Sequence, residues 1–245
     1  MLKIGVNTPL LKESIAEIGI YDTLKWVAEI GYHYIEVSQV PINPETVKEF
    51  RRAEDDFGIQ VCSISVDAEP EPQTPDGARK MNVRDDLEAI AEACRILSCK
   101  HCRTFSAGTD DFATEENVRK YAKKMDEAAE RLATVGLDSE RLTREFGADG
   151  RVAVMHLKDF RVPPIDKTEW LEIWKHLDQN LLCARIQFAE AGEGNLDIPG
   201  IISAGDDVGA EYIFLEQDLH YGRSEREILM TDYENLCRMG YKDRM

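Results

Sequence analysis

The chain has 245 residues, of which 43% are hydrophobic and 31% charged, and its formal net charge is -17 at pH 7. This length and apolar content predict one large α/β domain or two small ones and exclude a disordered chain. The excess of 47 acidic over 30 basic residues repels nucleic acid and anionic membrane surfaces, so neither is expected as a partner.

Strand and helix patterns alternate from the first residue onward. Strands are predicted over 3–10, 32–39, 59–67, 101–107, 152–160 and 211–220, and helices over 21–31, 44–58, 82–97 and 114–135. Such alternation predicts parallel strands joined by right-handed crossovers, in a barrel or a doubly wound sheet. No G-x-G-x-x-G or Walker-type loop follows a strand, which argues against a nucleotide-binding sheet.

The N-terminal sequence and the cysteines indicate the cellular compartment and the redox state of the thiols. The start, MLKIGVN, is already strand-like and lacks a signal-peptide pattern, and no apolar run reaches the roughly 18 residues of a membrane span. A cytoplasmic protein with reduced thiols is therefore expected. Cys99 and Cys102 have C-x-x-C spacing, but without a second pair core packing is the favoured interpretation.

Charged and polar side chains collect where the predicted strands end. His156, Lys158 and Asp159 end one strand, and the last strand ends in Glu216, Asp218 and His220. Glu36 and Asp67 stand on earlier strands. In such folds catalytic groups gather at the carboxyl ends of strands. Imidazole and carboxylate groups together suit a divalent ion such as Mn²⁺, Co²⁺, Mg²⁺ or Zn²⁺.

Three segments carry a resemblance to a known family. The segments are HLKD at 156–159, GEGNLDIP at 192–199 and YIFLEQD at 212–218. In order and spacing they resemble the closing third of the xylose isomerase-like TIM barrels that include sugar phosphate isomerases and epimerases. GYHYIE at 31–36 resembles the second strand of that family, so the resemblance is loose over 1–135 and closer over 150–245.

The resemblance implies one TIM-type barrel domain over 1–245 and one divalent metal near its axis. It implies His156 and Glu216 as metal ligands and Glu216 as the acid/base that moves a proton next to a sugar carbonyl. The substrate is expected to be a sugar or a sugar derivative. The cleft residues implied with them are Glu36, Lys158, Asp159, Arg161 and His220. A salt-bridged loop without substrate contact is an equal interpretation for Lys158 and Asp159.

The chain departs from the family between 136 and 150, where a short helix stands in place of two strands that each end in an acidic ligand. Asp138 is the one candidate for a surviving ligand there. A barrel of about six strands must close more narrowly, stay open, or cover its edges in a homo-oligomer.

Three functions stay open at this point. The first is a divalent-metal-dependent isomerase or epimerase acting on a sugar. The second is a non-catalytic carbohydrate-binding or partner subunit that has lost part of the metal site. The third, hydrolysis or lyase chemistry on the same scaffold, is weaker, because fold alone does not fix reaction type.

Overall fold

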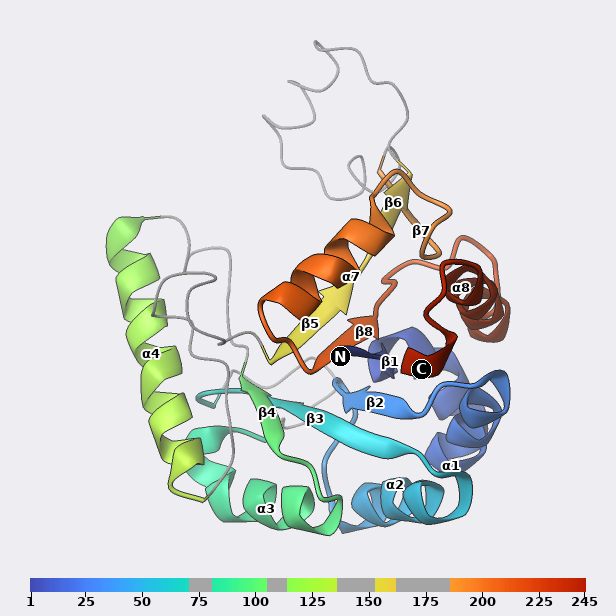
Figure 1. Cartoon of the computed structure of the whole chain (residues 1–245). Helices are drawn as coiled ribbons and strands as arrows, with labels where there is room; N and C mark the ends of the chain where they lie inside the picture. The colour runs from blue at the N-terminus through green and yellow to red at the C-terminus, as the bar shows by residue number, and fades with distance from the viewer. Residues whose placement is uncertain (71–80, 105–113, 136–152, 162–185) are drawn as a thin grey trace.

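The computed structural model describes residues 1–70, 81–104, 114–135, 153–161 and 186–245. Its main element is a six-stranded sheet in the order β4-β3-β2-β1-β8-β5 (Figure 1). The strands are β1 (Lys3–Asn7), β2 (Tyr34–Val37), β3 (Gln60–Val66), β4 (His101–Thr104), β5 (Val154–Leu157) and β8 (Tyr212–Leu215). All five pairings between them are parallel. The prediction of six parallel strands is therefore confirmed, and they form a half-barrel.

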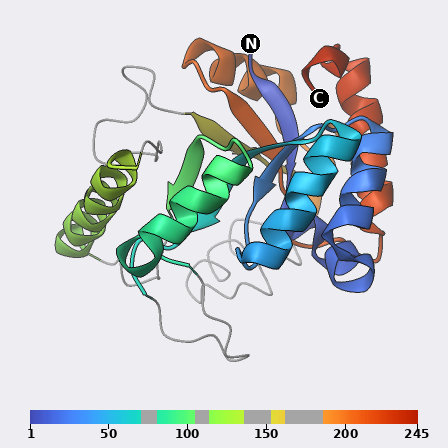
Figure 2. The ribbon, with the colours of Figure 1, turned by 90° about the horizontal axis from the view of Figure 1, so that it is seen from below.

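Helices cover the outer face of this half-barrel. They are α1 (Lys12–Ile30), α2 (Pro44–Phe57), α3 (Val83–Ile96), α4 (Glu115–Ala133), α7 (Ile198–Asp207) and α8 (Glu225–Arg238), with short 3₁₀ turns at Thr8–Leu11 and Lys242–Arg244. Figure 2 shows α1, α2 and α3 side by side along the sheet. Helix α1 packs between α2 and α8, and α4 packs on α3.

Capping residues explain where several helices begin. Asn43 and Thr46 form a reciprocal capping box at the start of α2, and Ser224 with Glu227 does the same for α8. Each box satisfies backbone N–H groups that the first helical turn leaves without partners. Gly58 then ends α2 in the left-handed conformation, with φ of 67°.

One helix boundary differs from the prediction. Helix α1 was expected to begin at Tyr21, but it begins at Lys12 and contains a break at Gly19, where φ is 83°. The short segment before the break contains too few apolar residues at helical spacing to predict a helix. Glycine adopts this positive φ without the backbone strain that a side chain would add, so two helical pieces join there.

The two faces of the sheet have different side chains because successive residues of a strand point in opposite directions. Ile4, Val6, Ile35 and Val37 point outward into the main hydrophobic core beneath the helices. The inward side chains form a second cluster, called here the aromatic layer, which consists of Tyr34, Cys62, Val154, Tyr212 and Phe214. This layer fills the half-barrel near the start of its strands.

Close packing in the aromatic layer requires a glycine on β1. Gly5 lies beside Phe214, and a Cβ there would come within 2.8 Å of the Phe214 ring and 2.2 Å of the Tyr34 carbonyl oxygen. The rings of Tyr212 and Phe214 are stacked at 5.9 Å. Lys3 also points inward and lies 4.8 Å from the centre of the Tyr34 ring.

A small antiparallel ribbon follows β5. It consists of β6 (Asp159–Arg161) and β7 (Gln187–Ala189). The Asp159 carboxylate is buried and accepts hydrogen bonds from the backbone N–H groups of Phe160, Gly192, Gly194 and Leu196. This carboxylate therefore fixes the GEGNL loop against the ribbon.

The cysteines and the hydropathy of the helices can be compared with the predictions from the sequence. The five described cysteines are free, and four of them are buried, including Cys99 and Cys102. Burial raises the pKa of the Cys62 thiol to about 12. Among the residues that the structure describes, no helix is long and apolar enough to span a membrane. The segment 136–150 lies outside those residues.

Candidate active site

Charged side chains stand directly above the aromatic layer, at the carboxyl ends of the strands. They come from β4, β2 and β5 and from the segments that follow β5 and β8. Cations and carboxylates alternate in a chain of contacts, called here the charged row, which runs Arg103, Glu36, His156, Glu216, Lys158, Asp218. Four of the residues predicted at the site, Glu36, His156, Lys158 and Glu216, thus lie together.

Glu36 is the most deeply buried member of the charged row, with a side chain that is 0% exposed. Its Oε1 accepts a hydrogen bond from Arg103 Nε at 3.0 Å, and its Oε2 lies 2.5 Å from His156 Nε2. A carboxylate removed from water is stable only when cations and donors meet both of its oxygens. Glu36 meets that condition through two residues from strands that are not its neighbours in the sheet.

His156 connects this buried end to the exposed end of the row. Its Nδ1 lies 2.5 Å from Glu216 Oε2, so both ring nitrogens are in contact with carboxylates. Glu216 Oε1 lies 3.3 Å from Lys158 Nζ, which also donates to Asp218 Oδ2 at 2.9 Å. The Lys158 and Asp218 side chains are 30% and 47% exposed, so the row opens to solvent there.

These contacts shift two pKa values in opposite directions. Burial opposes charge on His156, but the hydrogen bonds to Glu216 and Glu36 outweigh it and raise the pKa of the imidazole to about 9. Burial favours the neutral form of Glu216, but His156 and then Lys158 lower the pKa of its carboxyl to about 2. At neutral pH the row therefore contains an imidazolium between two carboxylates.

Two polar side chains flank Glu36 without partners among the described residues. Asn7 and Ser63 pair in register with Glu36 from either side, on β1 and β3. Both are fully buried, and neither the Asn7 amide atoms nor Ser63 Oγ has a hydrogen-bond partner. Unsatisfied buried polar atoms are rare in folded proteins and concentrate at functional sites.

Arg103 was missed by the sequence-based reasoning. Its strand was predicted, and His101 and Arg103 stand on the same face of that strand because they are two residues apart. His101 lies against the inward ring of Tyr212, so Arg103 also points into the half-barrel. Alternation along the strand was the signal that could have found it.

Asp159 and Arg161, which were predicted to contact substrate, lie in the ribbon beside the charged row and are not members of it. Asp159 is occupied by the four backbone N–H groups described above. Arg161 Nε donates to the Glu193 carbonyl oxygen at 3.1 Å, and its guanidinium lies 3.6 Å from Glu190 Oε2. Asp159 therefore fixes a loop through backbone hydrogen bonds, whereas Lys158, for which the same loop alternative was considered, forms ion pairs with Glu216 and Asp218.

His220 also lies apart from the charged row. It lies near Glu13 and Glu225. Each of the three residues offers one nitrogen or oxygen atom, these atoms lie within 4.8 Å of one another, and such a set could hold a cation. The Glu225 carboxylate already accepts from the backbone N–H groups of Glu13 and Ser14, at 2.7 and 3.0 Å. Its burial is therefore explained by its capping of the start of α1.

The contacts of His156 do not fit a metal ion held by His156 and Glu216. Two atoms bound to one zinc ion at about 2.1 Å each lie about 3 Å or more apart, whereas His156 Nδ1 and Glu216 Oε2 are 2.5 Å apart. The other ring nitrogen is equally close to Glu36. An ion could enter only if His156 left one carboxylate. Asp138, the remaining acidic candidate, lies outside the described residues.

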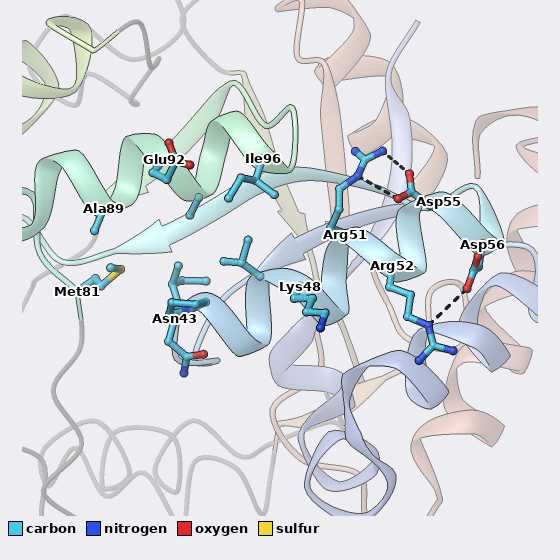
Figure 3. Close-up of a pocket in the computed structure, with 14 residues that line it drawn as sticks. Asn43, Lys48, Arg51, Arg52, Asp55, Asp56, Met81, Ala89, Glu92 and Ile96 are labelled. Carbon is cyan, nitrogen blue, oxygen red and sulfur yellow. Dashed lines mark hydrogen bonds and ion pairs between the residues drawn. The ribbon is translucent and has the colours of Figure 1, made fainter.

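A cavity of about 770 Å³ lies elsewhere, between α2 and α3 on the outer face (Figure 3). Val47, Met81 and Ile96 are among its lining residues. On the side of α2 shown in Figure 3, Arg51 and Arg52 pair with Asp55 and Asp56 of the same helix. The cavity is separated from the charged row by the sheet, which places the row on the inner face and the cavity on the outer face.

Comparison with known proteins agrees with this geometry. Residues 24–140 match the family model of the xylose isomerase-like TIM barrel. The chain has the xylose isomerase-like fold. The resemblance inferred from the sequence is confirmed, although the matched region is the first half and not the closing motifs. No curated protein sequence matches the chain.

Solved structures align over nearly the whole chain. A sugar phosphate isomerase/epimerase from Parabacteroides distasonis has a TM-score of 0.64 at 15% identity, covering 96% of this chain and 98% of that chain. The IOLI protein with a bound zinc atom has a TM-score of 0.66 at 13% identity, covering 98% and 99%. The 3-keto-D-glucoside 4-epimerase YcjR from E. coli has a TM-score of 0.55 at 14% identity, covering 98% and 100%. At these identities the likeness shows the fold.

Proposed function

We propose that the chain is an isomerase or epimerase that binds a sugar or sugar derivative at the charged row and moves a proton at the carbon next to its carbonyl. The observation that carries the proposal is the position of Glu216, at the end of β8 between His156 and Lys158. The similarity to a sugar phosphate isomerase/epimerase and to a sugar epimerase supports the same class of substrate.

Glu216 is the acid/base of this proposal. Its carboxyl is ionised at neutral pH, as a proton acceptor must be, because the pKa of the group is about 2. A carboxylate with so low a pKa is a weak base, so its basicity has to rise when substrate binds. Lys158 is the half-exposed neighbour through which a substrate can change it.

Lys158 links substrate binding to the basicity of Glu216. A carbonyl oxygen that approaches the ammonium group competes with Glu216 Oε1 for it, and loss of that ion pair makes the carboxylate more basic. The same ammonium then faces the oxygen on which negative charge develops when the C–H proton leaves. One residue thus polarises the carbonyl and activates the base.

The proton balance of the step is simple. Glu216 takes the proton from the carbon next to the carbonyl, and the electron pair of the broken C–H bond moves to the carbonyl oxygen to give an enediolate. For isomerisation, the Glu216 carboxylic acid then returns the proton to the former carbonyl carbon, while the proton of the neighbouring hydroxyl passes to the enediolate oxygen. For epimerisation, a solvent proton reaches the original carbon on its opposite face, and Glu216 releases its proton to solvent. No step is assigned to a metal ion, because His156 contacts both carboxylates directly.

The test is deuterium incorporation in D₂O, followed by proton NMR. The probes are D-fructose, D-xylulose and L-ribulose, each with and without a terminal phosphate. At least one is expected to exchange the hydrogen next to its carbonyl, and Glu216→Gln is expected to slow this by about 100-fold or more. The matched control is Glu211→Gln at the exposed other end of the strand, which should keep the wild-type rate. An unchanged rate in Glu216→Gln would overturn the proposal.

A second candidate is a non-catalytic carbohydrate-binding subunit. The observation in its favour is that each oxygen of Glu36 and Glu216 already has a cationic partner, which leaves Glu216 weakly basic. For such a subunit the same experiment would give another result. A ketose would raise the melting temperature of the protein, and no deuterium would enter the ketose with either the wild type or Glu216→Gln.

A further inference from the structure

We propose that His156 is a cationic positioning residue that takes the place of a metal ion between Glu36 and Glu216. The inference deepens the proposed function, because it concerns the same site, and it assigns the organisation of that site to ion pairs. The His156 ring contacts the carboxylates of both Glu36 and Glu216.

The hydrogen-bonding rules for imidazole fix the state of this ring. A carboxylate can only accept hydrogen bonds, so each ring nitrogen that bonds to one must carry a hydrogen. Both nitrogens of His156 lie 2.5 Å from carboxylate oxygens. The ring therefore donates twice, and neither nitrogen offers a lone pair to a metal ion.

Among the described residues, the neighbours of the ring supply a cation to each remaining oxygen of the two carboxylates. Arg103 neutralises the far oxygen of Glu36, and Lys158 neutralises the far oxygen of Glu216. Three cations and three carboxylates thus alternate along the charged row, with His156 at an inner position. A divalent ion inserted between His156 and a carboxylate would break one of the two hydrogen bonds that the imidazole ring donates.

The burial of Glu36 is the second, independent support. Its side chain has no exposed surface, and removing one partner of a buried ion pair leaves an uncompensated charge in the interior. If His156 turned away to bind a metal ion, Glu36 Oε2 would lose its cation. The geometry therefore favours a ring that stays in place.

The role of such a ring is to orient Glu216. The bond from Nδ1 fixes Oε2 on the inner side of the site, so Oε1 is directed to Lys158 and toward the exposed end of the row. A ligand entering from that end meets one oriented carboxylate oxygen beside one ammonium group. This is the arrangement that the proposed proton transfer requires, obtained from protein side chains.

The experiment is nitrogen-15 NMR of the histidine rings of the full chain, during titration with Zn²⁺ at neutral pH. The resonances of His156 are assigned by their loss in His156→Gln. The expected result is a pair of imidazolium-type resonances that keep their positions through one equivalent of Zn²⁺ and beyond. His101, on β4 against the ring of Tyr212, is the internal control for an intact fold.

One outcome overturns the inference: a His156 ring that becomes neutral and shows a zinc-coordinated nitrogen at one equivalent. Resonances of His220 that shift while those of His156 stay would support it, because they would locate zinc binding at the Glu13, His220 and Glu225 set. The readout is separate from turnover. Zinc on His156 overturns this inference alone, whereas failure of deuterium incorporation overturns the proposed function alone.

Discussion

The interior of the half-barrel has two levels that differ in chemistry, although both come from the same alternating positions of the same strands. On β8, Phe214 belongs to the aromatic layer, and the next inward residue, Glu216, belongs to the charged row. On β2 the corresponding pair is Tyr34 and Glu36. A step of two residues along a strand thus separates apolar packing from ion pairing.

This difference shows how the fold divides stability from function. The aromatic layer is apolar and closely packed, so truncation of its side chains costs hydrophobic and packing energy. The charged row compensates its own charges and opens to solvent at Lys158 and Asp218, so its outer members can change with smaller effects on stability. The following predictions test this division.

The largest expected effect on stability is in the aromatic layer. Phe214 is fully buried and stacks on Tyr212, so Phe214→Ala should lower the free energy of unfolding by about 3 to 5 kcal/mol. Urea unfolding followed by circular dichroism measures this change. A loss below about 1 kcal/mol would mean that the layer is not packed as described.

The second effect is a dependence of stability on pH through His156. Its pKa is about 9 in the folded protein against 6.5 for the free side chain, so its contribution is fully present below pH 6.5. It is lost as the pH rises through 9, and it is on the order of 3 kcal/mol. His156→Gln should remove this part of the alkaline loss of stability.

Asp232 also makes stability depend on pH, so its contribution must be separated from that of His156. Burial raises the pKa of its carboxyl to about 8, so it is favoured in the neutral form and destabilises the fold progressively as the pH rises from about 4 to 8. The effect of His156→Gln is therefore best measured in the Asp232→Asn background, with and without the histidine substitution. If both proteins lose the same stability between about pH 6 and 10, the His156 ion pairs do not stabilise the fold.

The smallest effect on stability is expected at the exposed end of the row. Lys158→Met should change the free energy of unfolding by less than about 1 kcal/mol, because surface ion pairs contribute little. Deuterium incorporation should nevertheless fall by about 100-fold, since the cation facing the developing charge is lost. Lys158→Arg, which keeps the charge, should recover part of the rate. Equal rates in Lys158→Met and the wild type would remove Lys158 from the mechanism.

The sequence predicted the fold better than the contacts of the site. Period-2 and period-3.6 patterns identified all six parallel strands and four of the helices, because these patterns are local. The rule that functional groups gather at strand ends predicted His156, Glu216, Glu36 and Lys158, which the structure brings together in the charged row. Local patterns could not identify partners, because Glu36 and His156 are 120 residues apart in the chain.

Residues at the strand ends were harder to sort by role. Asp159 and Lys158 are adjacent in the sequence, yet one fixes a loop through backbone N–H groups and the other faces solvent beside Glu216. The metal expectation rested on residue types and on the family resemblance, neither of which supplies distances. The structure adds distances, and at 2.5 Å the imidazole and carboxylates are hydrogen-bonded partners.

The most direct test of the division between the two levels compares Phe214→Leu with Glu216→Gln, which change neighbouring inward positions of one strand. Melting temperature and the rate of deuterium incorporation into the fastest-exchanging ketose are measured for both. We expect a lower melting temperature with a rate lowered by less than about 100-fold for Phe214→Leu. For Glu216→Gln we expect a rate lowered by about 100-fold, together with some loss of stability, because an amide replaces the carboxylate that pairs with His156. A Glu216→Gln protein that exchanges the ketose at the wild-type rate would contradict this expectation.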